Sequence, residues 1–257
     1  MPRVRLDSLL AERGLFASRS RAAAAVIAGE VRLGGAAGRR AEKPGQLVAA
    51  DVELAVAARP PYVSRGGIKL ANALDALGLD VRGRLALDVG ASTGGFTDCL
   101  LANGAAHVVA LDVGHGQLHP RLRDDPRVCV LERTNVRHAK SETIGGEVDG
   151  AVVDVSFISL RVIIPVLVGL CQPGVPMVLL VKPQFEAGRA EVSRGRGVIT
   201  DPAIHERAQT EIDAALVAAG CVVHGWMPSP ILGSRGNREF LVHASTPRVR
   251  SPEVGTR

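Results

Sequence analysis

The chain has 257 residues, a hydrophobic content of 46% and a formal net charge of +5, which fits a globular protein with one large and one small domain. Its longest apolar run, 162–171, contains Pro165 and is too short to span a bilayer, and the charged N-terminus lacks the apolar core of a signal peptide. Four widely spaced cysteines without a CxxC motif disfavour disulfides and metal sites, so we expect no metal, no membrane partner and a cytoplasmic location.

Basic charge is concentrated in the first sixty residues, which carry ten Arg or Lys side chains against six Asp or Glu. Leucines at helical spacing predict a first helix, and Ser18 or Ser20 would cap a second helix over residues 21–28. Alternating polar and apolar residues predict short strands at 30–33 and 51–56. Such a basic module suits contacts with nucleic-acid phosphates, although a solvated Arg-rich surface or a small structural cap gives the same pattern.

Beyond a Pro-rich linker at 57–61, apolar segments of strand length alternate with helical stretches. The near-continuous apolar character of the strands predicts a parallel sheet, with an antiparallel pair last. Seven strands in this pattern are typical of class I, Rossmann-like methyltransferases that use S-adenosylmethionine, so the fold class is α/β with a small α+β domain in front. Strands are expected at 85–89, 107–113, 128–132, 150–155, 177–181, 222–227 and 240–243, and helices from Lys69 and at 96–102, 159–170 and 202–219.

A loop with three glycines follows the first of these strands, in the segment DVGASTGGFTD. Glycines let the backbone approach a ligand, and the helix behind the loop offers free N–H groups to a carboxylate. Asp112 ends the next strand, where an acid accepts hydrogen bonds from ribose hydroxyls in dinucleotide-binding folds. The chain lacks GxGxxG and GKS/T motifs, which disfavours NAD and ATP; a structural turn is the alternative. We therefore predict S-adenosyl-L-methionine as the cofactor, bound by Asp88, Gly90, Ala91, Ser92, Thr93, Gly94, Gly95, Phe96, Thr97, Asp112, Asn135 and Asp154.

Four ionisable residues, Lys69, Asp154, Lys182 and Glu239, each lie near the start or end of an expected element. A parallel sheet brings such ends to one edge, where ligands bind. Two ammonium groups facing two carboxylates beside a nucleoside site indicate deprotonation of a weakly acidic ribose hydroxyl. In this mechanism Lys182 receives or stabilises the proton, Asp154 orients Lys182, and Glu239 balances Lys69. A strand-end cap and a loop charge are the alternatives for Asp154 and Lys182.

The full set of motifs resembles one family. The segments SRGGIKL, DVGASTGGFTD, ALDVGHGQL, ERTNVR, DVSFISL, LVKPQFE and GNREF are similar to those of the TlyA-type proteins, hemolysin-labelled 2′-O-ribose methyltransferases of ribosomal RNA. RLDSLL, SRSRAA and IAGEVRLGG resemble the ribosomal-protein-S4-like RNA-binding module that this family carries in front of an FtsJ/RrmJ-like catalytic domain. The resemblance covers residues 3–245 and implies that Lys69, Asp154, Lys182 and Glu239 form the family's catalytic tetrad. It also implies cytidine substrates in small- and large-subunit ribosomal RNA and, in some bacteria, a link to capreomycin sensitivity.

These observations predict an S4-like RNA-binding domain at 1–58, a linker at 59–64, an FtsJ-like methyltransferase domain at 65–246 and a disordered tail at 247–257. The Gly/Arg-rich loop after Lys182 is a candidate for a lid that RNA orders. An rRNA-binding assembly factor without essential catalysis and, less favoured physically, a cytolysin remain alternative functions. Candidate contacts with ribosomal RNA come from basic residues in both domains: Arg3, Arg5, Arg19, Arg21, Arg65, Arg133, Arg137 and Arg189.

Overall fold

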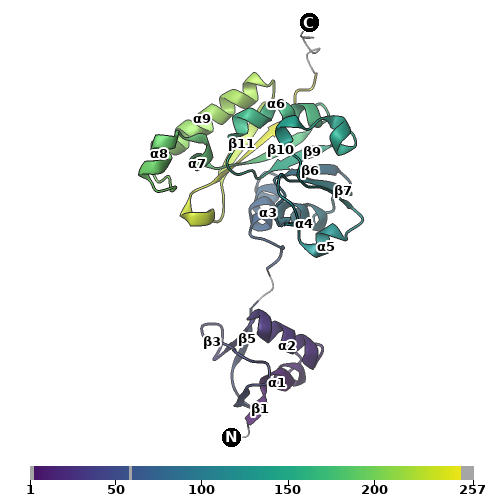
Figure 1. Ribbon diagram of the computed structural model, residues 1–257, viewed down its shortest axis with the longest axis vertical. Coiled ribbons are helices and arrows are strands. Elements are labelled where there is room, and N and C mark those ends of the chain that lie inside the picture. The colour runs from purple at the N-terminus through teal and green to yellow at the C-terminus, as the bar shows by residue number, and fades with distance from the viewer. Residues whose placement is uncertain (1–2, 58–59, 250–257) are drawn as a thin grey trace. The chain divides into compact units, whose positions relative to one another are not determined.

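The computed structural model describes residues 3–57 and 60–249, except for the side chains of residues 189, 190, 194 and 234. The chain divides into two compact units, Met1–Pro60 and Pro61–Arg257, and each has its own hydrophobic core (Figure 1). Residues 58–59, beside and within the expected linker, and residues 250–257 of the expected disordered tail lie outside the described residues. Within the described ranges, no helix combines the length and apolar character needed to cross a bilayer.

The smaller unit is built from two helices and two small antiparallel sheets, β1–β4 and β3–β2–β5. Leu6, Leu10 and Val26 are almost fully buried where the helices pack together, and Ser18 caps the second helix by accepting a hydrogen bond from the Arg21 N–H (3.2 Å). Both expected helices and both expected strands are confirmed. The other three strands, β1, β3 and β4, were not expected. The elements are β1 (Arg3–Arg5), α1 (Leu6–Glu12), α2 (Arg19–Ala28), β2 (Val31–Leu33), β3 (Arg39–Arg40), β4 (Leu47–Ala49) and β5 (Leu54–Val56).

The larger unit contains a seven-stranded sheet in the order β11-β12-β10-β9-β6-β7-β8. Every neighbouring pair is parallel except the two that include β12, so the expected mixed sheet is confirmed. Several expected strands ran one or two residues too far, because the chain leaves the sheet before the polar residues that follow. The strands are β6 (Leu85–Val89), β7 (His107–Leu111), β8 (Val128–Leu131), β9 (Gly150–Val153), β10 (Pro176–Val181), β11 (Val222–Pro228) and β12 (Phe240–Ser245).

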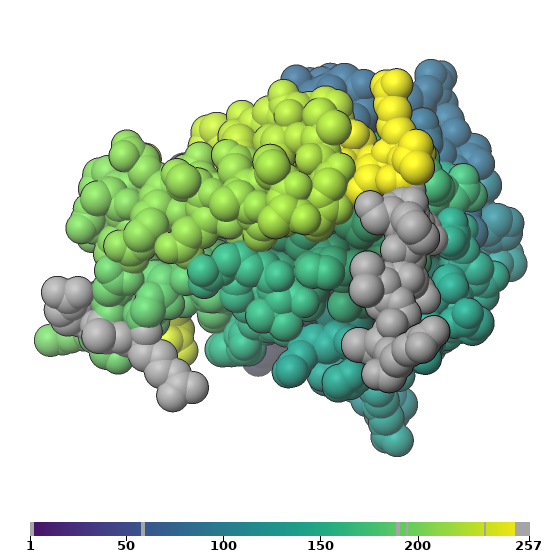
Figure 2. Space-filling view, turned by 90° about the horizontal axis from the view of Figure 1, so that it is seen from above, coloured from purple at the N-terminus to yellow at the C-terminus, as the bar shows by residue number. Residues whose placement is uncertain are grey.

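Helices cover both faces of this sheet and bury alternate residues of its strands. One core lies under α6 and α9 and includes Leu87 and Val109, whereas the other lies under α3 and α4 and includes Ala86 and Val108. The helix α9, which lies on the surface in yellow-green in Figure 2, packs against α6. The helices are α3 (Gly66–Ala76), α4 (Gly95–Ala102), α5 (Pro120–Arg123), α6 (Leu160–Leu170), α7 (Pro183–Glu186), α8 (Arg189–Arg194) and α9 (Pro202–Ala218), with 3₁₀ turns at Val136–His138, Ser141–Ile144 and Ser234–Gly236.

The topology gathers polar segments at one edge of the sheet. The parallel strands β6, β7, β9 and β10 all end there, and β12 begins there because it runs antiparallel to β10, with Phe240 opposite Val181. Residues directly after the parallel strands and directly before β12 therefore meet at this edge.

Candidate active site

The four ionisable residues expected at the sheet edge form two ion pairs in one cavity of about 500 Å³. Lys182, directly after β10, places its Nζ 2.5 Å from Oδ1 of Asp154, which directly follows β9. The same Nζ donates a hydrogen bond to Oγ of Ser156 (3.1 Å). Lys69, in the first turns of α3, pairs with Glu239, the residue before β12. Residues from four separate segments thus converge on one cavity.

These charges are largely removed from solvent. The side chains of Lys69 and Lys182 are each 10% exposed, that of Glu239 is 3% exposed and that of Asp154 is 23% exposed. A buried charge is tolerated when it is paired, and removing one partner leaves the other uncompensated. The cavity therefore holds two ammonium groups and two carboxylates whose formal charges cancel. In the described part of the chain, no cluster of three or more His, Cys, Asp or Glu residues could hold a metal ion.

The glycine loop after β6 forms the wall between β9 and the helix α4. Gly90 has φ +85°, and a Cβ there would lie 2.4 Å from the Asp154 carbonyl oxygen, so only glycine fits at this contact. Gly95 opens α4 against the segment before α3, where an added Cβ would lie 2.1 Å from Oγ of Ser64. Glycine at both positions therefore lets the loop pack closely against its neighbours, and both residues also line the first cavity.

A second cavity of about 510 Å³ shares the lining residues Gly90, Ser92, Asp154 and Ser156 with the first, so the two are adjacent. Asp112, after β7, lines this second cavity and accepts hydrogen bonds from the backbone N–H groups of Ser92 (2.8 Å) and Gly114 (2.6 Å). Its carboxylate thereby ties the ends of the two neighbouring loops together.

The residues expected to bind the cofactor divide into three sets. The first cavity is lined by Gly90, Ala91, Ser92, Thr93, Gly95, Phe96 and Asp154. The second is lined by Asp112 and Asn135 and by three members of the first set, Gly90, Ser92 and Asp154. Asp88, Gly94 and Thr97 line neither of these two cavities.

Asp88 is fully buried at the end of β6, below the glycine loop. Its Oδ2 accepts a hydrogen bond from the Thr97 hydroxyl (2.7 Å), while its Oδ1 has no hydrogen-bond partner among the described residues. Burial is the main cause that raises the pKa of Asp88 to about 7, and the nearby carboxylates of Asp154 and Asp112 add to it. Asp88 therefore joins the end of β6 to the first turn of α4 through Thr97, and its pKa lies near neutral pH.

This pKa predicts how the stability of the larger unit depends on pH. An acid whose pKa is raised on folding binds its proton more tightly in the folded state, so the free energy of unfolding falls as the pH rises from 4 towards 7. From the unfolded value of 3.8 and the folded value of about 7, the loss between pH 5 and 8 is about 3 kcal/mol. Asp88→Asn keeps an oxygen for the Thr97 hydroxyl but removes the titration, so its stability should fall by about 3 kcal/mol less over this range.

Urea unfolding at several pH values, followed by the fluorescence of the single tryptophan, Trp226 in β11, measures this difference. Parallel curves of stability against pH for Asp88→Asn and the unaltered protein would contradict the assignment.

The basic residues expected to contact RNA have different surroundings. Arg65 is exposed and lines the first cavity, and Arg137 is exposed and lines the second. Arg133 is also exposed, lines neither cavity and has φ +53°. The side chain of Arg189 lies outside the described residues. In the smaller unit, Arg3 and Arg21 are exposed, whereas Arg5 and Arg19 pair with the buried carboxylate of Asp7, at 2.7 and 3.2 Å.

Two residues of the site were not anticipated. Ser156 lines both cavities and accepts a hydrogen bond from Lys182. Phe157 is 92% exposed with φ +65°, and its ring centroid lies 5.2 Å from that of Phe185. Both follow Asp154 in the segment DVSF, so the rule that ligands bind beyond strand ends would have included them. A non-glycine residue with positive φ is strained, and such strain is concentrated at functional sites.

Comparisons with known proteins agree with this architecture. A model of the FtsJ-like methyltransferase family matches residues 62–246. The 16S/23S rRNA (cytidine-2′-O)-methyltransferase TlyA of Mycobacterium tuberculosis is 46% identical over 97% of this chain and 92% of that protein. Hemolysin A of Brachyspira hyodysenteriae is 39% identical over 93% of this chain and 99% of that protein. A solved structure of a hemolysin-named protein from Streptococcus thermophilus aligns with a TM-score of 0.73 and 42% identity, over 99% of this chain and 92% of that one. The chain belongs to the FtsJ-like methyltransferase family and, within it, to the TlyA-type proteins.

Proposed function

We propose that the protein transfers a methyl group from S-adenosyl-L-methionine to the 2′-oxygen of a cytidine ribose in ribosomal RNA. The observation that carries this proposal is the presence of two lysine–carboxylate ion pairs in a cavity adjacent to the one that Asp112 lines. A hydroxyl acceptor needs groups that remove its proton and stabilise the oxygen, and the first cavity supplies them. The relative named as a 16S/23S rRNA (cytidine-2′-O)-methyltransferase supports ribosomal RNA and cytidine as the substrate.

The residues at the sheet edge fit S-adenosyl-L-methionine. Gly90 and Gly95 line the first cavity without side chains, so a ligand can come close to the backbone there, and the N-terminus of α4 would offer N–H groups to the methionine carboxylate. Asp112 would accept hydrogen bonds from the ribose hydroxyls, and Asn135 would line the nucleoside side of the site. When bound, the cofactor supplies an electrophilic methyl group.

The chain's own residues carry the proton chemistry. Lys182 lies against Asp154 and Ser156 and acts on the ribose 2′-hydroxyl. As a neutral amine it receives the hydroxyl proton, and the ammonium so formed, paired with Asp154, stabilises the negative charge that develops on the oxygen. Asp154 fixes the direction of the Lys182 side chain. Lys69, held by Glu239, adds a second positive charge in the same cavity, which favours the oxygen as it loses its proton.

Recognition of the RNA is assigned to both units. The smaller unit, which we propose to be an S4-like RNA-binding module, presents Arg3 and Arg21 to solvent, and phosphate contacts from such residues position a protein on folded RNA. Arg65 and Arg137 at the two cavities would hold the backbone of the nucleotide that enters. The substrate is the small ribosomal subunit, the large one, or both. A reaction on ribosomal subunits would take place in the cytoplasm.

The test supplies isolated 30S and 50S subunits with methyl-labelled S-adenosylmethionine and then maps 2′-O-methyl groups on each RNA. We expect label on the ribose of one cytidine in at least one subunit. Cofactor binding measured by calorimetry without transfer to either subunit would favour an rRNA-binding assembly factor instead.

A further inference from the structure

Glu186 is a buried carboxylate at the end of α7 that lines neither of the two cavities of the active site. Its side chain is only 1% exposed, although it lies four residues after Lys182 at an edge of the sheet where ligands bind. Burying a charge is costly unless hydrogen bonds and counter-charges compensate for it. The contacts of this residue therefore indicate what it does for the site.

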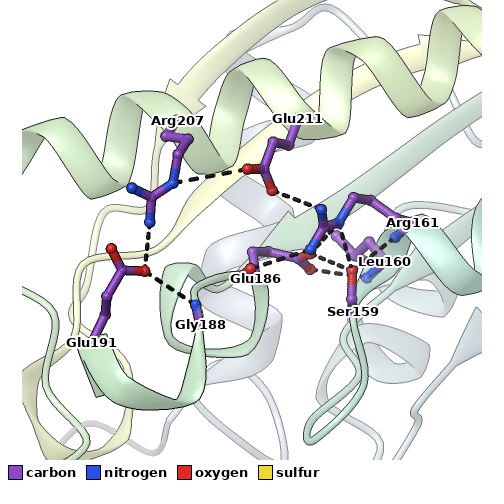
Figure 3. Close-up of polar contacts among 8 residues, drawn as sticks. All are labelled: Ser159, Leu160, Arg161, Glu186, Gly188, Glu191, Arg207 and Glu211. Atoms are coloured by element: carbon purple, nitrogen blue, oxygen red, sulfur yellow. Dashed lines mark hydrogen bonds and ion pairs between the residues drawn. The ribbon is translucent and has the colours of Figure 1, made fainter. Parts of the chain in front are cut away.

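The contacts of Glu186 join the loops that follow β9 and β10. Its Oε2 accepts a hydrogen bond from the Ser159 hydroxyl (2.5 Å), and its Oε1 accepts one from the Leu160 N–H (2.9 Å). Arg161 donates to the Glu186 carbonyl oxygen (3.2 Å) and lies 3.6 Å from the carboxylate (Figure 3). Glu186 thus binds the first turn of α6 from a different segment of the chain, which favours its negative charge there.

These contacts matter because no strand pairing joins the loops that follow β9 and β10. The ladder between β9 and β10 ends at the pair Val153–Leu179, before either loop begins. One loop carries Asp154 and Ser156 before it reaches Ser159, and the other carries Lys182 before it reaches Glu186. The Lys182–Asp154 ion pair joins the two loops close to the strands, and the hydrogen bonds of Glu186 with Ser159 and Leu160 join them further from the strands. We call these Glu186 contacts the clamp.

Further ion pairs anchor this clamp to α9. Arg161 also forms an ion pair with Glu211 of α9 (2.8 Å), and Glu211 lies 3.8 Å from Arg207 on the same helix. Arg207 also pairs with Glu191 of α8 at 2.5 Å, and Glu191 accepts a hydrogen bond from the Gly188 N–H (3.1 Å). Figure 3 shows these contacts as one chain that runs from the clamp to the segment after it. The clamp is therefore fixed to a long helix of the core.

We propose that Glu186 is a positioning residue, which holds the loops after β9 and β10 so that Lys182 meets Asp154 in the geometry of the reaction. This inference rests on the proposed function for its kinetic consequences and on the contacts above for its structural ones. Burial raises the pKa of Glu186, while the Ser159 and Leu160 hydrogen bonds and the charge of Arg161 act in the opposite direction.

The test compares Glu186→Ala with Glu186→Gln in the full chain. Glutamine keeps an oxygen for the Leu160 N–H and presents an amide group that donates to the Ser159 hydroxyl, so it should restore the clamp. We expect Glu186→Ala to lower kcat about 10²-fold, as a misplacement of about 1 Å does, while KM for the subunits and the cofactor Kd change less than about threefold. Glu186→Gln should recover kcat to within about threefold of the unaltered protein.

A matched control is Asp149→Ala, because Asp149 directly precedes β9, at the end of that strand opposite to the active site. Asp149 accepts a hydrogen bond from the Leu85 N–H (2.9 Å), so its loss should lower stability without changing kcat. The double variant Glu186→Ala/Lys182→Ala should be no slower than Lys182→Ala, because both changes act on one group. An unchanged kcat in Glu186→Ala, additive losses, or equal loss of kcat and cofactor binding in both Glu186 variants would overturn the proposal.

A crystal structure of Glu186→Ala tests the positioning role of Glu186 without an activity assay, and therefore independently of the proposed function. Absence of methyl transfer by the unaltered protein would refute the function, and the structure would then decide the positioning role alone. We expect the separation of Lys182 Nζ and Asp154 Oδ1, 2.5 Å here, to increase by about 1 Å. An unchanged separation would overturn the positioning role.

Discussion

Replacing Lys182 by alanine should lower the rate of methyl transfer about 10²- to 10⁴-fold, the range that a positioned acid or base contributes. Lys182 is the residue whose Nζ contacts both Asp154 and Ser156. Among the described residues, Lys69 is the other lysine that lines the cavity, and it is paired with Glu239. The Asp154 side chain is 23% exposed, so water can solvate it once its partner is gone and the fold should survive. Single-turnover transfer to ribosomal subunits measures the effect, with circular dichroism as the check on folding.

The matched control for this substitution is Lys140→Ala. Lys140 is an exposed lysine of the same unit that lines neither cavity, so its loss should leave the rate unchanged. Asp154→Ala should resemble Lys182→Ala in rate, because it removes the group that fixes the lysine. A normal rate for either active-site variant would remove these residues from the mechanism.

Deleting residues 1–60 should abolish methylation of ribosomal subunits while leaving cofactor binding intact. The removed unit has its own core, and both cavities are lined by residues of the larger unit alone. It also carries most of the excess positive charge, +4 from ten basic and six acidic residues, out of +5 for the whole chain. Because phosphate contacts supply much of the affinity for RNA, the remaining unit should bind subunits weakly. Calorimetry with S-adenosylmethionine and a methylation assay on subunits measure the two properties separately.

A single-residue version of this experiment uses Arg21→Glu in the full chain. Arg21 is exposed, whereas Arg19 on the same helix is engaged by Asp7, so Arg21 is the cleaner probe. Loss of one phosphate contact should flatten the dependence of log affinity on log salt by about one unit of slope. If the truncated protein methylates subunits at the full-length rate, the smaller unit is a structural cap and its assignment to RNA binding is wrong.

Local pattern was enough to predict most of the fold of the larger unit. Apolar runs of strand length, broken by glycines and polar residues, predict seven strands, and the structure confirms all seven to within a few residues at their ends. The carboxyl ends of parallel strands share one edge, so the positions of Asp112, Asp154 and Lys182 could be inferred without side-chain geometry. These features depend on residues close together in sequence and on topological rules that hold for all such sheets.

Only the tertiary structure decided which groups touch. Lys69 and Glu239 are 170 positions apart, and their pairing depends on how α3 and β12 pack against the same edge. The burial of Glu186 and the engagement of Arg19 by Asp7 leave no trace in a periodic pattern, because both follow from segments brought together by packing. The short strand β1 exists for the same reason, since Arg3 lies opposite Ala49. The sequence by itself determined the elements and the edge of the sheet at which polar residues gather, whereas the pairing of charges within that edge is a property of long-range packing.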